Sequence, residues 1–154
     1  MDKNMQRTMI GHGALVFLVG LLAGFPFVLY LTGDFPLGEL LSFEVDVAGD
    51  TRGWRMAHAE GILNGMVVMI GAVILPVLNM SPETQKITGW ALIITAWGNG
   101  IAAVLAPLFE VRGLYLGDGA ANIVVHLLFM VAIVAVIVAM VLIAKAAFKK
   151  AGGD

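Results

Sequence analysis

The sequence predicts an all-α integral membrane protein, a four-helix bundle with both termini in the cytoplasm. Three observations support this fold class: the composition, the number of long apolar runs and the distribution of Lys and Arg. Of the 154 residues, 60% are hydrophobic and 13% are charged, and the mean hydropathy is +0.94. A soluble domain is closer to half apolar and about 25% charged. The length fits one domain, residues 1–154.

Four apolar runs are each long enough to cross the hydrocarbon core of a membrane, which takes about 20 helical residues. Helices are expected because every backbone polar group must be satisfied inside lipid. The predicted helices cover residues 8–31, 54–79, 86–109 and 119–145. We expect the first to be a membrane span and not a cleaved signal, because its apolar run is too long and no small-residue cleavage site follows.

The connections between the predicted helices differ in length and charge. Residues 32–53 form a long acidic loop, and the alternating SFEVDV at 42–47 favours a short strand or an extended cover. The connection at 80–85 is tight, and the one at 110–118 contains glycines suited to turns.

The distribution of Lys and Arg predicts the topology, since positive residues concentrate on the cytoplasmic side. Six of these residues lie at the termini and beside the second connection, and three lie on the opposite side. The first group is Lys3, Arg7, Lys86, Lys145, Lys149 and Lys150, and the second is Arg52, Arg55 and Arg112. Both termini are therefore expected in the cytoplasm, with the acidic loop outside.

The composition also excludes several classes of site. The chain has no Cys, so it has no disulfide and no thiolate ligand, and a net charge of −2 gives no nucleic-acid footprint. GLYLGDG at 113–119 lacks the strand context of a dinucleotide site. His, carboxylate, amide and Met side chains remain as metal ligands.

Polar side chains are concentrated in one predicted membrane segment, residues 53–66, with the sequence GWRMAHAEGILNGM. His58, Glu60 and Asn64 lie inside the second predicted helix. Ionisable residues in a membrane helix are costly and by default indicate a functional site. A simpler interpretation stays open for two of them: His58 could bond a backbone carbonyl, and Glu60 could reach the solvated headgroup region.

Helical spacing divides this segment into two stripes. His58, Gly61 and Gly65 follow i, i+3, i+7 spacing and share one face, whereas Glu60 and Asn64 form a neighbouring stripe. A flat prosthetic group could lie against the first stripe, with His58 as its ligand. The same two glycines are also a helix-packing motif, so both interpretations stay open.

The third and fourth predicted helices carry further polar residues. Asn64 and Asn99 each lie roughly 15 Å from the outer ends of their helices, so they can share one layer of the membrane. His126, at a depth of roughly 10 Å, can join this layer as a ligand or serve only in packing. Asn122 and Met130 continue its row at i±4 spacing, and Met130 is expected to fill the core.

The remaining His and the Trp residues have simpler expected roles. His12 lies at the cytoplasmic end, where we expect packing or a hydrogen bond. Trp54 suits an interfacial belt. Trp90 and Trp97 share a face by i, i+7 spacing and are expected to pack.

Several stretches together resemble one family, the styrene oxide isomerases. They are RTMIGHG at 7–13, GWRMAH at 53–58 with the following ILNGM, AWGNG at 96–100 and VRGL at 111–114. Proteins of this family are small four-helix membrane proteins that bind haem b, assemble as trimers and isomerise aryl epoxides to aldehydes. The resemblance covers most of the chain and is most specific in the second predicted helix.

The resemblance implies a role for particular residues. His58 matches the axial haem ligand, and Asn64 matches an amide near the open face of a ferric iron that acts as a Lewis acid. The predicted catalytic residues are Asn64 and Asn99. The predicted haem contacts are His58 as iron ligand, Trp54, Gly61 and Gly65. His126, which the resemblance does not supply, is a candidate second ligand.

The resemblance also implies partners and a location. The expected substrate is a small lipophilic epoxide that partitions into the bilayer. We expect a homotrimer with haem near the protomer interfaces, because four short helices could hardly enclose a haem alone. The expected location is the bacterial inner membrane, with no nucleic-acid partner.

The chain departs from the family at two positions of the third predicted helix. The isomerases carry an aspartate two residues before the Trp of AWGNG and a tyrosine four residues after its Asn, where this chain has Thr95 and Ala103. Glu60 and His126 are not expected at their places in the isomerases. The departures concern the reaction more than the haem site.

Two other functions stay open at this point. A haem redox or sensing protein would use His126 as a sixth ligand and close the iron to substrate. A haem-free transport or assembly subunit would use Glu60 and the paired glycines for packing or proton movement.

Overall fold

The structure, a computed structural model, describes residues 1–33, 47–117 and 119–149. Within these residues it contains four long helices, one short 3-10 turn and no strand. The elements in order are α1 (Lys3–Thr32), α2 (Thr51–Ile74), η2 (Leu75–Val77), α3 (Pro82–Leu108) and α4 (Ala120–Phe148). The all-α fold class is confirmed. The extended segment predicted at 42–47 lies outside the described residues except for Val47.

The helices α2 and α3 begin earlier than their apolar runs, because capping residues decide where each of them starts. Asp50 precedes α2, and its carboxylate accepts a hydrogen bond from the Gly53 N–H at 2.6 Å. Ser81 precedes α3, and its hydroxyl accepts from the Thr84 N–H at 3.2 Å. Such caps satisfy backbone donors that have no partner within the helix. The predicted starts at 54 and 86 were therefore wrong by three and four residues.

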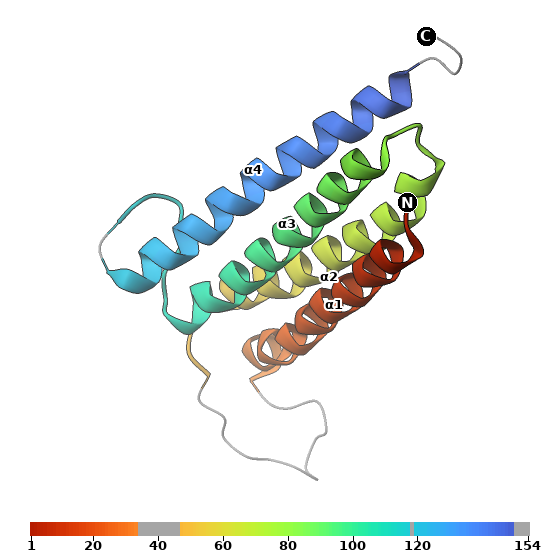
Figure 1. Cartoon of the computed structure of the whole chain (residues 1–154). Coiled ribbons are helices and arrows are strands. Elements are labelled where there is room, and N and C mark those ends of the chain that lie inside the picture. The colour runs from red at the N-terminus through yellow and green to blue at the C-terminus, as the bar shows by residue number, and fades with distance from the viewer. Residues whose placement is uncertain (34–46, 118, 150–154) are drawn as a thin grey trace.

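The four helices run side by side with neighbours antiparallel, and both termini lie at the same end of the bundle (Figure 1). α1 packs on α2, α2 on α3 and α3 on α4, so α3 is the central and most buried helix. Each of the four is long and apolar enough to cross a membrane. Termini at one end agree with the predicted topology, and the assignment of that end to the cytoplasm stays a prediction.

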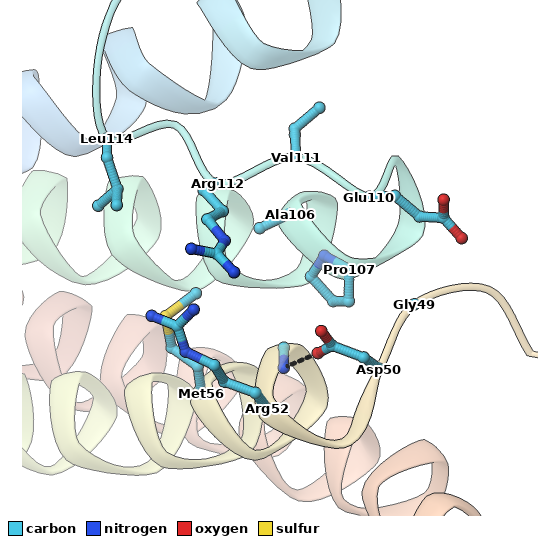
Figure 2. Close-up of a pocket in the computed structure, with 11 residues that line it drawn as sticks. Gly49, Asp50, Arg52, Met56, Ala106, Pro107, Glu110, Val111, Arg112 and Leu114 are labelled. Atoms are coloured by element: carbon cyan, nitrogen blue, oxygen red, sulfur yellow. Dashed lines mark hydrogen bonds between the residues drawn. The ribbon is translucent and has the colours of Figure 1, made fainter.

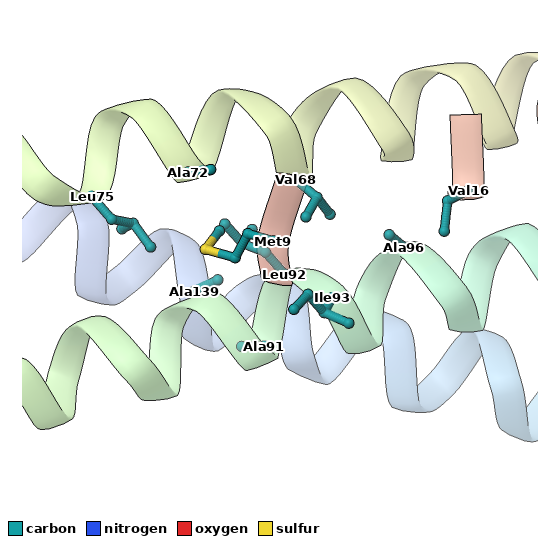
Figure 3. Close-up of a cluster of buried hydrophobic side chains, with 10 residues drawn as sticks. All are labelled: Met9, Val16, Val68, Ala72, Leu75, Ala91, Leu92, Ile93, Ala96 and Ala139. Carbon is teal, nitrogen blue, oxygen red and sulfur yellow. The ribbon is translucent and has the colours of Figure 1, made fainter. Parts of the chain in front are cut away.

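An apolar cluster fills the half of the bundle nearer the termini (Figure 3). Side chains from all four helices contribute to it, and Met9, Leu75 and Leu92 are its largest fully buried members. Most other positions in the cluster are alanines or valines. Small residues let membrane helices approach closely and gain packing contacts, which drive their association in lipid.

Glycines bring α1 and α2 into backbone contact. A Cβ on Gly61 would lie 2.4 Å from the Gly20 Cα, and a Cβ on Gly65 would lie 2.6 Å from the Gly13 carbonyl oxygen. No side chain can be added at these distances without moving a backbone. The stripe on which we expected a flat prosthetic group is therefore occupied by α1, and Gly61 and Gly65 serve the packing interpretation.

Candidate functional site

His58 lies in the seam between α1 and α2, where its ring contacts the backbone of α1. Its Nδ1 is 2.8 Å from the Gly20 carbonyl oxygen. A carbonyl can only accept, so Nδ1 donates, and in the neutral form of the ring the lone pair then lies on Nε2. Histidines that bind metals usually donate their other ring N–H in this way, which fixes the tautomer. His58 therefore meets the requirement for a ligand through Nε2.

Two α1 residues that the sequence analysis missed shape the space around this ring. A Cβ on Gly24 would lie 2.9 Å from His58 Nδ1, so glycine is what lets the ring reach the carbonyl. The Phe27 ring lies 6.1 Å from the imidazole between centroids, tilted by 30°. The spacing of Gly20 and Gly24, four residues apart on one face of α1, was the available signal.

The two predicted catalytic residues meet between α2 and α3. Asn99 Nδ2 donates to Asn64 Oδ1 at 3.2 Å. Asn64 Nδ2 in turn donates to the Glu60 carboxyl oxygen Oε2 at 2.7 Å and to the Glu60 backbone carbonyl at 2.9 Å. All three side chains are partly buried. Glu60 thus belongs to the same polar cluster. Its carboxylate accepts a hydrogen bond from the Asn64 side chain, so it is more than a solvated group in the headgroup region.

His58 and Asn64 diverge within one chain. They are six residues apart on α2, which places their directions roughly 120° apart around the helix axis. His58 faces α1 through Gly20, whereas Asn64 faces α3 through Asn99. One copy of the chain therefore does not bring the predicted iron ligand and the predicted oxygen-binding amides to the same place.

Trp54 forms a hydrogen bond with the end of the acidic loop. Its indole N–H donates to the Ala48 carbonyl at 2.8 Å, and the side chain is 4% exposed. It packs in a small cluster with Ala23, Ala57 and Ala103. The ring is therefore buried between helices in the first turn of α2, and its interfacial position stays a prediction.

The two positions that depart from the isomerases hold helices together. Ala103 is fully buried beside Trp54. The Thr95 hydroxyl lies 2.8 Å from the Ala91 carbonyl on its own helix and 3.2 Å from the Ala132 carbonyl on α4. Neither side chain reaches the Asn64–Asn99 pair by a hydrogen bond, so α3 contributes only Asn99 to that cluster.

His126 and Asn122 hold the loop between α3 and α4. His126 Nδ1 donates to the Gly113 carbonyl at 2.9 Å, and the Gly113 N–H donates to Asn122 Oδ1 at 2.9 Å. Gly113 has a φ of +62°, a conformation that favours glycine. α4 packs mainly on α3, whereas His58 lies between α1 and α2. The two histidines therefore occupy different helix pairs.

His12 forms a separate contact nearer the termini. The Trp97 indole N–H donates to His12 Nδ1 at 3.0 Å, and the Trp90 ring lies 6.2 Å from the imidazole between centroids. Both tryptophans thus pack against His12, as their shared face predicts. His12 therefore packs and forms a hydrogen bond, as we expected from the sequence.

A cavity of about 370 Å³ opens at the loop end of the bundle, between the start of α2 and the end of α3 (Figure 2). Arg52 and Arg112 point toward each other across it, and Met56, Ala106 and Pro107 line its apolar part. None of the predicted catalytic or haem-binding residues lines this cavity. It is therefore distinct from both the His58 seam and the Asn64–Asn99 pair.

A sequence model of the styrene oxide isomerase family matches residues 5–148, which include all four helices. This chain belongs to the styrene oxide isomerase family. It is 34% identical over 94 residues to a protein of Pseudomonas fluorescens named styrene-oxide isomerase. The aligned stretch covers 61% of this chain and 56% of that relative, so it spans little more than half of the relative's length. The family predicted from the motifs is confirmed.

Proposed function

We propose that this protein is a haem b-dependent epoxide isomerase of the bacterial inner membrane, which converts a lipophilic epoxide into a carbonyl compound. One observation carries the proposal: in a chain of this family, His58 Nδ1 donates to the Gly20 carbonyl, which in the neutral ring leaves the lone pair on Nε2. Haem bound at that nitrogen would supply a Lewis acid for the epoxide oxygen. The reaction is an isomerisation, so it consumes no co-reactant.

The residues of the chain have separable tasks in this proposal. His58 would hold the iron, and the Gly20 carbonyl fixes its tautomer. The Asn64–Asn99 pair would supply a hydrogen-bond donor to the oxygen of the substrate while one C–O bond breaks and a hydride moves to the neighbouring carbon. The apolar side chains of the bundle would keep water from the electron-poor carbon. A lipophilic epoxide reaches such a site from the bilayer.

The divergence of His58 and Asn64 supports the expected homotrimer. Because the two side chains face different helices of their own chain, one copy would supply the His58 face and a neighbouring copy the Asn64 face. Closed rings of identical subunits arise from such head-to-tail contacts. Large apolar side chains exposed along α1 and α4 are compatible with contact to lipid or to another copy. The haem would then lie near the protomer interface.

The test is an optical spectrum of the purified protein before and after addition of styrene oxide, with phenylacetaldehyde assayed in the same sample. We expect a Soret band, a spectral change when the epoxide is added, and formation of the aldehyde. Protein from haem-replete cells without Soret absorption would overturn the cofactor assignment. A six-coordinate low-spin spectrum that the epoxide leaves unchanged would instead favour a redox or sensing role.

A further inference from the structure

We infer that Glu60 is a positioning residue that occupies both amide hydrogens of Asn64, and that Asn99 therefore provides the free amide N–H for the substrate oxygen. This inference rests on the proposed function in one respect only, the identity of the ligand as an epoxide oxygen. The arrangement of the hydrogen bonds can be tested without any substrate. The assignment differs from the simplest expectation, in which Asn64 itself donates to the substrate.

A count of donors and acceptors leads to this assignment. An asparagine side chain has two N–H donors and one carbonyl acceptor. Both Asn64 donors are engaged by Glu60, at 2.9 Å to its backbone carbonyl and 2.7 Å to its carboxyl oxygen, while Asn64 Oδ1 accepts from Asn99. Asn99 makes one such bond, so its second N–H has no partner among the described residues.

The orientation of the Asn64 amide follows from the same contacts. If the amide were flipped, its carbonyl oxygen would face the Glu60 backbone carbonyl, which can only accept, and its NH₂ group would face the NH₂ group of Asn99. Two acceptors would then oppose each other, and so would two donors. Buried or partly buried polar groups avoid such arrangements because a donor or acceptor that has lost its water and gains no partner destabilises the fold. The backbone carbonyl of residue 60 and Asn99 therefore determine which way Asn64 points, and the Glu60 carboxylate accepts a further N–H of the amide in that orientation.

The surroundings leave few other donors for the substrate oxygen. Thr95 is bonded to backbone carbonyls of α3 and α4, and Ala103 has no polar group. Asn99 is partly exposed and lies beside Asn64 at the edge of the α2–α3 contact. A positioned N–H donor stabilises charge that develops on oxygen in the transition state, and loss of one such donor elsewhere lowers kcat about 10²- to 10³-fold.

The first experiment tests the hydrogen bonds in the full-length protein without substrate. The chain has five asparagines, so their side-chain NH₂ groups can be resolved by selective ¹⁵N labelling and assigned by single substitutions. We expect Glu60→Ala to shift the Asn64 NH₂ resonances and to speed their exchange with solvent about tenfold. Glu60→Gln should restore the parental pattern, since its amide oxygen can still accept. An unchanged Asn64 signal in Glu60→Ala would overturn the role of Glu60.

The second experiment tests which amide serves the substrate, by a double-mutant cycle on kcat/KM with styrene oxide. We expect Asn99→Ala to lower kcat/KM about 100-fold in the parent, as loss of one such donor does elsewhere. In the Glu60→Ala background the loss should fall to about tenfold, because Asn64 then has a free N–H. An equal loss in both backgrounds would overturn the coupling. If the parent shows no turnover, the proposed function fails, and the NMR result alone decides the role of Glu60.

Discussion

At the scale of single residues, the hydrogen bond on one nitrogen of His58 prepares the other nitrogen for a ligand. The ring is held against α1 by the Gly20 carbonyl, and Gly24 leaves room for it. A histidine held in one tautomer and one orientation loses little further freedom when it binds a metal. From the sequence, a hydrogen bond from His58 to a backbone carbonyl was the simpler alternative to metal binding. The structure contains that bond, and the same bond would orient His58 as a haem ligand.

Substitution of His58 tests this directly. We expect His58→Ala to lower the haem content of the purified protein at least about tenfold, since loss of a residue that only hydrogen-bonds to a metal ligand already costs about 10- to 100-fold in metal affinity. His126→Gln is the matched control, because glutamine can still donate to the Gly113 carbonyl that His126 binds. The measurement is the ratio of haem, by pyridine haemochrome assay, to protein. Unchanged haem in His58→Ala would contradict the ligand assignment.

At the scale of elements, the position of His58 depends on how closely α1 approaches α2. The carbonyl that orients the ring belongs to Gly20, the residue whose backbone lies against Gly61. Any change that separates the two helices also moves the hydrogen-bond acceptor of His58. The glycines that we first considered as a surface for haem thus support the position of His58 indirectly, through helix packing.

We expect Gly61→Ala to destabilise the protein by about 1–3 kcal/mol, the usual cost of overpacking a tight contact. The added Cβ would meet backbone atoms of Gly20 at 2.4 and 2.5 Å, and a backbone cannot move aside as a side chain can. Gly11→Ala on α1 is the control, since a Cβ there meets nothing within 4 Å. The stability of each variant is measured by thermal unfolding in detergent. Equal Tm values for the two variants would show that the contact is looser than the structure has it.

At the scale of the whole molecule, one chain presents its two candidate faces in different directions. His58 opens toward the α1 side of α2, and Asn64 lies on the α3 side. α4 adds little enclosure, because it packs mainly on α3 and most of it is exposed. An assembly of copies is therefore the simplest way to place an iron between the two faces.

Subunit complementation distinguishes an interface site from a site within one chain. Co-expression of His58→Ala and Asn64→Ala chains, each expected to be inactive alone, should restore about a third of the parental kcat in mixed trimers, because each mixed ring of three has one ordered interface with both residues intact. The measurement is aldehyde formation by purified mixed oligomers carrying two different affinity tags. No recovered activity, with mixed oligomers present, would place both residues of one site in the same chain.

The sequence alone determined the fold class, the number of helices and the family. The fold class and the number of helices follow from the length and apolarity of four segments, and the family follows from short motifs. None of the three depends on how the helices pack. It also placed Asn64 and Asn99 at one depth, because helical rise converts residue number into distance along the axis. The helix starts were missed at Asp50 and Ser81, since a cap precedes the apolar run that was used to find the helix.

Only the tertiary structure decided which face of each helix meets which neighbour. Helical periodicity relates His58, Glu60 and Asn64 to one another on α2, but it does not state how α2 is rotated relative to α1 and α3. In this chain that rotation is set by contacts between small residues such as Gly20 and Gly61, which allow backbones to approach. Each helix carries apolar side chains on more than one face, so hydrophobic periodicity could not have predicted the rotation of α2 relative to its neighbours.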